Sequence, residues 1–165
     1  MEAKTRAAKF ADDFVAAQDE LVRLVESIRP DQWRLVGKNF PDRSNNEDEG
    51  RSVGVIAHHV ADSEQFIIDR IYQMLEGKTL TRVDFHDVNA RHAANHADVT
   101  HEEVLALLRA NRASIEPRVR AIPDDALDAV HDTPAGPATI AQRLDRVLIG
   151  HLKVHQGSIE AALSA

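Results

Sequence analysis

The stretch Ser52-Val-Gly-Val-Ile-Ala-His-His-Val-Ala-Asp-Ser-Glu64 opens the segment that decides the fold. From its start to about residue 76, apolar residues recur at intervals of three and four, which is the period of one face of a helix. A glycine at position 77 is typical of a residue that ends a helix. The sequence therefore predicts a long amphipathic helix over residues 52–76, whose apolar face must be covered by other helices. That face carries Val53, Ile56, Val60, Ile67, Ile71 and Met74.

Three further segments show the same period. The first covers residues 4–28 and is ended by Pro30. The next is opened by Thr100-His-Glu-Glu103, a capping-box pattern, and Pro117 predicts a bend near its end. The last runs from about residue 138 to 163, after the break at Pro134-Ala-Gly-Pro137. A loop or short helix lies between the second and third, and no segment has a convincing strand period. We therefore predict an all-α, antiparallel four-helix bundle with long loops, as a single domain over residues 1–165.

The charge balance of the chain is acidic. Its 27 Asp and Glu residues outnumber its 20 Lys and Arg residues, which gives a formal net charge of −7. Proteins that bind nucleic acid usually present the opposite sign on their contact face. No cluster of Lys and Arg interleaved with aromatic residues overrides this. We therefore expect a small-molecule substrate and no nucleic acid among the partners.

The chain contains no cysteine. This excludes disulfides, zinc–thiolate sites and a nucleophilic thiol supplied by the protein itself. No apolar run approaches the roughly 20 residues that a helix needs to span a bilayer, so we expect no membrane partner. The N-terminal residues lack the apolar region of a signal peptide, which predicts a cytoplasmic location.

Two histidines are one helical turn apart in Gly150-His-Leu-Lys-Val-His155. This spacing puts His151 and His155 on one face of the last helix, in line with its apolar residues. Two such imidazoles can bind one divalent ion, and a third from a neighbouring helix would complete a facial set with positions left open. The other interpretation is a pair of core histidines whose nitrogens are satisfied by hydrogen bonds.

The second helix supplies a candidate for the third ligand. His59 lies at the edge of the apolar face, whereas His58 points further toward the polar side and is expected to be exposed or to support a ligand. Glu64 projects near the centre of the apolar face, where a carboxylate needs a partner. It either pairs structurally with an arginine or a helix end, or hydrogen-bonds a ligating imidazole. Asp62 is either solvated or a hydrogen-bond partner of His59.

Other polar features of the sequence carry further predictions. His92 and His96 form a second His-x-x-x-His pair, but they lie in a polar, alanine-rich segment, so we expect no metal there. His86, His101 and His131 are expected at the surface or in loops. Residues 42–49 are charged and turn-rich, which indicates a connection or a lid.

The stretch from residue 52 to 64 resembles the first signature of the DinB/YfiT-like superfamily. That signature is a helix opening followed by His, a hydrophobic residue, Ala and an acidic residue. In this register the family's first ligand falls on His59, and the family's second signature, His-x-x-x-His on the last long helix, is matched by His151 and His155. The resemblance covers nearly the whole chain. It implies an up-down-down-up bundle and a divalent ion, often zinc or nickel, held by these three histidines.

The resemblance also implies a chemistry. Members include thiol-dependent S-transferases and the mycothiol-dependent maleylpyruvate isomerase, so we expect a metal-dependent transferase, or a hydrolase-like enzyme, that uses a low-molecular-weight thiol. The absence of cysteine fits a thiol supplied from outside, and no catalytic residue is assigned. The alternative is a non-catalytic metal-binding or stress-related module, with Phe10 and Phe14 on a face that pairs two copies into a homodimer. A pocket beside an open coordination position would favour the enzyme.

Overall fold

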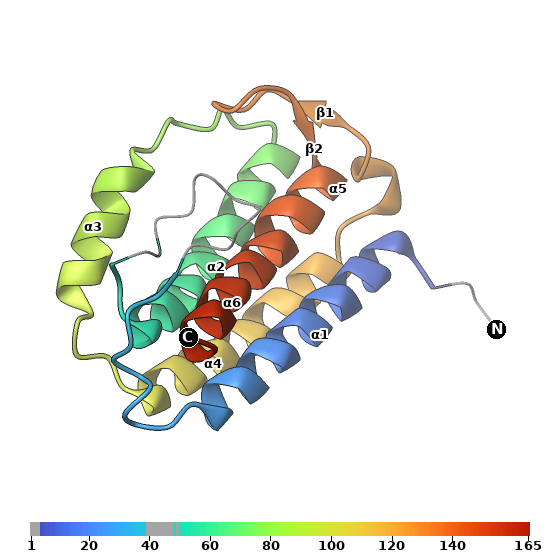
Figure 1. The fold of residues 1–165 in the computed structure, drawn as a ribbon. Coiled ribbons are helices and arrows are strands. Elements are labelled where there is room, and N and C mark those ends of the chain that lie inside the picture. The colour runs from blue at the N-terminus through green and yellow to red at the C-terminus, as the bar shows by residue number, and fades with distance from the viewer. Residues whose placement is uncertain (1–3, 39–47, 49) are drawn as a thin grey trace.

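The computed structural model describes residues 4–38, 48 and 50–165. Four rods lie side by side in Figure 1, with α1 packed against α4 and α2 packed against the C-terminal rod. This confirms the predicted all-α four-helix bundle. The rods are α1 (Arg6–Ser27), α2 (Val53–Leu75), α4 (His101–Arg120) and a continuous run of α5 (Ile140–Arg143), the π-helical turn η2 (Leu144–Ile149) and α6 (Gly150–Leu163).

The direction of the chain follows the up-down-down-up order. In Figure 1, α1 and α6 run one way along the bundle and α2 and α4 run the other way. Because α2 and α4 run in the same direction, the chain must return along the length of the bundle between them. The short helix α3 (Phe85–Asn95) lies in this return segment, outside the bundle and beside α2. It thereby forms one wall of the site described below.

Local signals start and stop the helices where the sequence predicts. The side chains of Thr5 and Ser52 accept hydrogen bonds from backbone N–H groups in the first turns of α1 and α2. At the start of α4, Thr100 and Glu103 form the expected reciprocal capping box. After α2, Gly77 adopts a φ of 70°, which residues with a side chain rarely do, and thereby ends the helix.

The core is aliphatic and lies between the four rods. From α1 it receives residues spaced by three or four, all fully buried, including Ala7, Phe14, Leu21 and Val25. Phe10 is partly buried against the same core. The expectation that Phe10 and Phe14 form an exposed pairing face is therefore wrong for Phe14, whose ring packs inward. A homodimer stays a prediction.

A buried polar network joins three of the rods around Glu64. Its carboxylate is 1% exposed and accepts hydrogen bonds from Gln18 Nε2, at 3.1 and 3.0 Å, and from Asn111 Nδ2, at 2.8 Å. The Arg112 Nε atom donates to Gln18 Oε1 at 2.9 Å. Burial raises the pKa of Glu64 to about 7, although the two amide hydrogen bonds and Arg112 act in the opposite direction. Of the two roles considered for Glu64, structural pairing or a hydrogen bond to a ligating imidazole, the structure shows the structural one.

Two features of the C-terminal half were not predicted. A two-stranded antiparallel sheet of β1 (Val130–His131) and β2 (Ala138–Thr139) follows the 3₁₀ turn η1 (Asp124–Ala126). Strands of two residues are too short to show an alternating pattern. The predicted last helix contains the π-helical turn η2, in which the Gly150 N–H bonds to the Asp145 carbonyl. Such a turn accommodates an extra residue within a helix and often marks a functional site.

Within the described part of the chain, none of the helices combines the length and apolarity needed to cross a bilayer. The cytoplasmic location stays a prediction.

Candidate metal centre and its pocket

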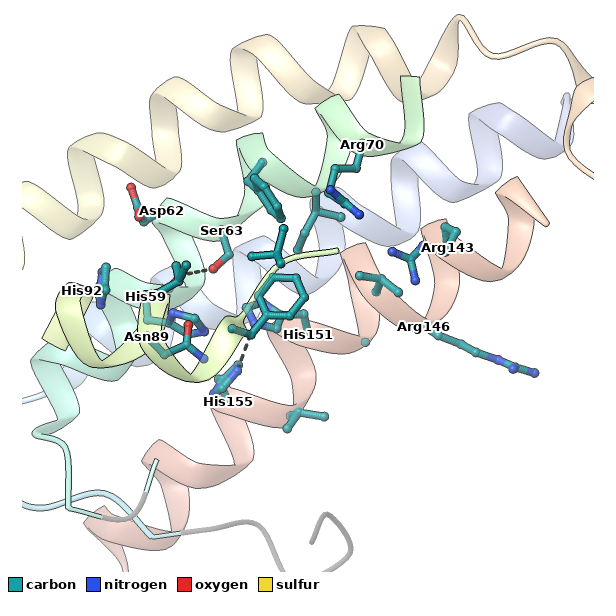
Figure 2. A pocket seen from close by; sticks show the side chains of 18 of the residues that line it. His59, Asp62, Ser63, Arg70, Asn89, His92, Arg143, Arg146, His151 and His155 are labelled. Atoms are coloured by element: carbon teal, nitrogen blue, oxygen red, sulfur yellow. Dashed lines mark hydrogen bonds between the residues drawn. The ribbon is translucent and has the colours of Figure 1, made fainter. Parts of the chain in front are cut away.

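Three histidines from two rods converge on one point, and we call them the first histidine group: His59, His151 and His155 (Figure 2). The ring centroid of His59 lies 5.1 Å from that of His151 and 5.0 Å from that of His155, and the latter two are 4.4 Å apart. All three pairs of rings meet edge-on, with interplanar angles of 64° to 78°. One nitrogen from each ring lies within 4.8 Å of the other two. The structure thus brings together the three residues that the sequence singled out.

A buried carboxylate orients one of these rings. Asp48 Oδ2 lies 2.5 Å from His155 Nδ1, which leaves His155 Nε2 facing His151 Nε2 at 3.1 Å. An imidazole that donates from one nitrogen to a carboxylate presents the lone pair of the other, which is the usual arrangement behind a metal ligand. His151 Nδ1 is buried and has no hydrogen-bond partner among the described residues. The group therefore has more nitrogen lone pairs than hydrogen-bond donors to satisfy them.

The position of Asp48 depends on the chain before α2. Arg51 N donates to the Asp48 carbonyl at 3.1 Å, and Gly37 N donates to the Arg51 carbonyl at 2.6 Å. A Cβ atom on Gly37 would lie 2.1 Å from Ile56 Cδ1 and 2.9 Å from the Asp48 carbonyl oxygen, so only glycine fits here. Asp48 belongs to the segment of residues 42–49 that was predicted as a connection or lid, and the other residues of that segment lie outside the described part.

Burial sets the charge state of the group. It lowers the pKa of His59 to about 2, with the charges of His151 and His155 acting in the same direction. Burial, with the charge of His155, lowers the pKa of His151 to about 3. For Asp48, burial opposes ionisation, but hydrogen bonds from His155 and Ser158 hold its pKa below the usual value. The centre therefore combines neutral imidazoles at His59 and His151, the form that binds metals, with an ionised carboxylate at Asp48.

A pocket of about 700 Å³ opens beside the first histidine group, between α2, α3 and the C-terminal rod (Figure 2). All three histidines of the group line it at one end. Its walls include apolar side chains from three segments, and arginines lie further along α2 and the C-terminal rod. The apolar residues are Phe66, Ile67, Val83, Phe85, Val88, Val147 and Val154.

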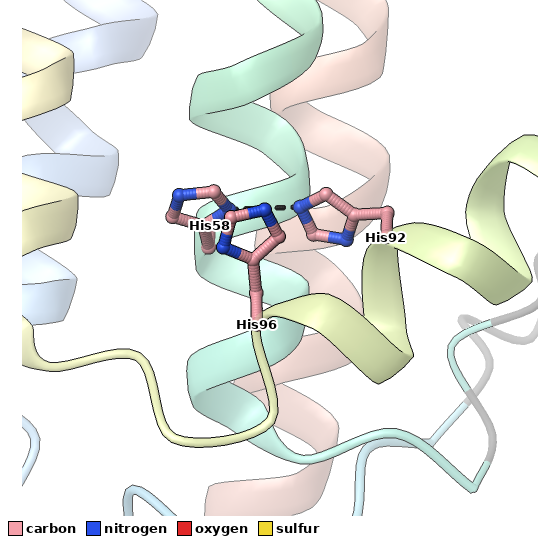
Figure 3. Close-up of side chains that lie close together, drawn as sticks. All are labelled: His58, His92 and His96. Atoms are coloured by element: carbon pink, nitrogen blue, oxygen red, sulfur yellow. Dashed lines mark hydrogen bonds between the residues drawn. The ribbon is translucent and has the colours of Figure 1, made fainter.

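A second histidine group lies against α3 and consists of His58, His92 and His96 (Figure 3). Its nitrogens also lie within 4.8 Å of one another. Its rings, however, are nearly parallel: His58 stacks on His96 at 4.0 Å and 24°. His58 Nδ1 and His92 Nε2 form a hydrogen bond of 2.8 Å. Because a nitrogen lone pair lies in the plane of its ring, stacked rings point fewer lone pairs at a common centre than edge-on rings do.

This second group corrects two predictions. Of the two alternatives for His58, the exposed position is wrong: the side chain is buried, because α3 covers the side of α2 on which it lies. His92 and His96, which were expected to have no metal role, belong to a cluster that could hold an ion. Helical spacing along one segment gives no signal for a cluster that forms between α2 and the return segment.

Neither Asp62 nor Glu64, the two carboxylates closest to His59 in the sequence, supports a histidine of the first group among the described residues. Asp62 is exposed at the edge of the pocket and makes no hydrogen bond with His59 among the described residues. Glu64 belongs to the core network. The carboxylate that contacts a histidine of the group is Asp48, 107 residues away from His155 in the chain. No fixed spacing could have identified it.

Solved structures of the same fold exist. One is the crystal structure of the colibactin self-resistance protein ClbS in complex with a dsDNA. It has a TM-score of 0.69 and 14% identity, and the match covers 100% of this chain and 99% of that one. Another, an uncharacterised protein from Escherichia coli UTI89, has a TM-score of 0.69 and 12% identity, with coverage of 98% and 94%. No curated protein matches the chain.

The ClbS structure overturns one expectation. ClbS, a protein of this fold, was crystallised in complex with double-stranded DNA, so the prediction that nucleic acid is excluded is wrong. The net charge of a whole chain was a poor basis for that prediction, since nucleic-acid binding depends on where charges lie on the surface.

The matched family model is described as the DinB superfamily and covers residues 13–159. This range contains α2 with His59 and both histidines of α6, together with the connections between the rods. The match therefore spans most of the chain and all the residues of the first histidine group. The chain belongs to the DinB superfamily.

Proposed function

We propose that this protein binds one divalent transition-metal ion, zinc or nickel, through His59, His151 and His155. We further propose that it acts as a metal-dependent transferase with a low-molecular-weight thiol as nucleophile. The observation that carries the proposal is the convergence of three imidazoles, one of them backed by Asp48, at the end of an open pocket.

The nitrogen geometry supports the metal. Two nitrogens that bind one tetrahedral zinc ion lie about 3.3 Å apart, because each Zn–N bond is about 2.0 Å long. The 3.1 Å between the Nε2 atoms of His151 and His155 is close to this value. The first histidine group is preferred to the second because its rings meet edge-on, whereas His58 and His96 of the second group are stacked.

The pocket supports a catalytic role. An ion held by three neutral ligands keeps its double positive charge and would favour the thiolate form of a bound thiol. Transfer would form a bond between the thiol sulfur and a carbon of the substrate, release the thiol proton and expel a leaving group with its bonding electrons. The residues of the chain would orient both molecules in the pocket, while Asp48 fixes the ring of His155. A closed site without a pocket would have favoured the non-catalytic alternative.

The experiment that tests this function measures thioether formation. Untagged protein loaded with Zn²⁺ or Ni²⁺ is mixed with a panel of low-molecular-weight thiols and alkyl or aryl halides, and products are followed by mass spectrometry. We expect formation above the spontaneous rate for the wild type and His96→Ala, and the spontaneous rate for His151→Ala. Equal rates for the wild type and His151→Ala would contradict the proposal. A wild type that binds metal but never exceeds the spontaneous rate would leave the non-catalytic module as the better interpretation.

A second prediction concerns Asp48. The Asp48→Asn variant keeps the shape of the side chain but loses the charge that orients His155, so we expect the affinity for Zn²⁺ to fall by about 10- to 100-fold. Competition with a chromogenic chelator measures this affinity. Asp62→Asn is the matched control, because Asp62 is an exposed carboxylate at the same pocket. A variant at Asp48 that binds zinc as tightly as the control would show that the carboxylate has no role in ligation.

A further inference from the structure

Two arginines approach each other at the end of the pocket away from the histidines (Figure 2). Arg70 extends from α2 and is only 9% exposed, and Arg143 extends from α5. Arg70 Nη2 donates to the Thr81 carbonyl at 2.9 Å, and its guanidinium lies 5.4 Å from the centre of the Phe66 ring. Arg70 is thus held in a fixed place on the pocket wall.

The charge of this pair is not neutralised within the described residues. Neither Arg70 nor Arg143 has a carboxylate within ion-pair distance there, whereas Arg118 and Arg120 on α4 pair with Asp69 and Asp12. Burial, together with the charge of Arg70, lowers the pKa of Arg143. Two guanidinium groups that are partly withdrawn from water and repel each other are unfavourable unless an anion joins them. The pair therefore has the character of an anion-binding subsite.

Apolar side chains line the wall between the two ends. Phe66 is 42%, Phe85 53% and Val88 40% exposed, and all three face this pocket. The two phenylalanine rings pack edge to face with centroids 6.1 Å apart. Exposed apolar residues gathered in one pocket indicate a ligand with an apolar part.

We propose that the pocket takes an amphipathic small molecule, whose terminal carboxylate or similar anionic group pairs with Arg70 and Arg143. Its apolar body would lie along Phe66 and Phe85, and its reactive end would reach the first histidine group. This inference rests on the proposed function and names its substrate class. At 1.5 Å per helical residue, His59 and Arg70 are about 16 Å apart along α2. The arginine side chain extends several ångströms toward the ligand and covers part of this separation. A ligand with an apolar chain of about ten carbons would cover the rest.

The test compares two ligands with the same apolar chain. Decanoate carries the anionic group and 1-decanol does not, and isothermal titration calorimetry measures the binding of each. We expect the wild type to bind decanoate at least about 10-fold more tightly than 1-decanol, which is the strength of one charged hydrogen bond. Arg143→Met should abolish this preference and leave 1-decanol binding unchanged. Arg109→Met, which removes an exposed arginine outside the pocket, is the matched control and should behave as the wild type.

The same titrations separate this inference from the metal proposal. They are repeated with metal-free protein and with His151→Ala. A preference for decanoate that persists there and disappears in Arg143→Met supports the anion subsite, even if no ion binds the histidines. Equal affinities for the two ligands in the wild type would overturn the inference. The inference would also be overturned if the preference for decanoate required metal and remained unchanged in Arg143→Met, because the ion would then hold the carboxylate.

Discussion

Replacing His151 with alanine is expected to weaken Zn²⁺ binding by more than about 100-fold. The loss should exceed that for Asp48→Asn, because His151 would be a ligand and Asp48 only orients one. In the wild type, free Zn²⁺ at 100 times the dissociation constant should stabilise the fold by about 2.7 kcal/mol. For a chain of this size that corresponds to a rise in Tm of about 5 to 10 °C. The His151→Ala variant should show no such rise at the same Zn²⁺ concentration.

Differential scanning calorimetry with and without Zn²⁺ measures this effect. His96→Ala is the matched control, because it removes one histidine of the second group and leaves the first group intact. It should keep the full shift in Tm. If His96→Ala loses the shift and His151→Ala keeps it, the ion binds the second histidine group, and its assignment to the first histidine group is wrong.

The free energy of unfolding of the wild type is expected to fall by about 3 kcal/mol as the pH rises and Glu64 ionises. Replacing Glu64 with glutamine should remove this loss. The pKa of Glu64 is about 7 in the folded protein, compared with 4.5 for an unperturbed glutamate. At about 1.4 kcal/mol per pH unit, this difference gives the stated free energy. It is a buried group, so solvent screening reduces the effect little.

The sign follows from which state holds the proton. Below the unfolded pKa of 4.5 both states are protonated, and Glu64 has no effect on the free energy of unfolding. As the pH rises toward about 7, the unfolded chain releases its proton while the folded protein keeps it, so stability is lost. Above the folded pKa both states are ionised and the loss is complete. Glutamine has no proton to release and removes this slope.

Urea unfolding at a series of pH values between about 4 and 8 measures the effect. The free energy of unfolding of the wild type minus that of Glu64→Gln should fall by about 3 kcal/mol across this range. Histidines also titrate there, but they do so in both proteins and cancel in the difference. Glu160→Gln, at an exposed site on α6, is the matched control. A constant difference for Glu64→Gln would mean that folding does not raise the pKa of Glu64.

The helices were predictable because their signals are local. The recurrence of apolar residues in the segment after Ser52, the capping box at Thr100 and the glycine at position 77 each depend on neighbours within a few residues. The spacing of His151 and His155 is of the same kind. The position of His59 beside His151 and His155 could be predicted because the apolar face of α2 must turn toward the core, which brings His59 with it.

The supporting parts of the site were not predictable, because they depend on contacts between distant segments. Asp48 reaches His155 from a charged connection, at a place fixed by the close approach that Gly37 permits. His58 and His92 meet only because α3 returns along α2. The π-helical turn before Gly150 likewise gives no apolar period of its own.

The sequence by itself determined the four helices, their apolar faces and the three histidines, since periodicity and caps are short-range properties of the chain. Only the tertiary structure decided which carboxylate lies behind His155, that Glu64 serves the core, and that Arg70 and Arg143 share one end of a pocket. The physical reason is that burial, hydrogen-bond pairing and charge repulsion depend on the packing of segments far apart in the chain, which no local pattern encodes.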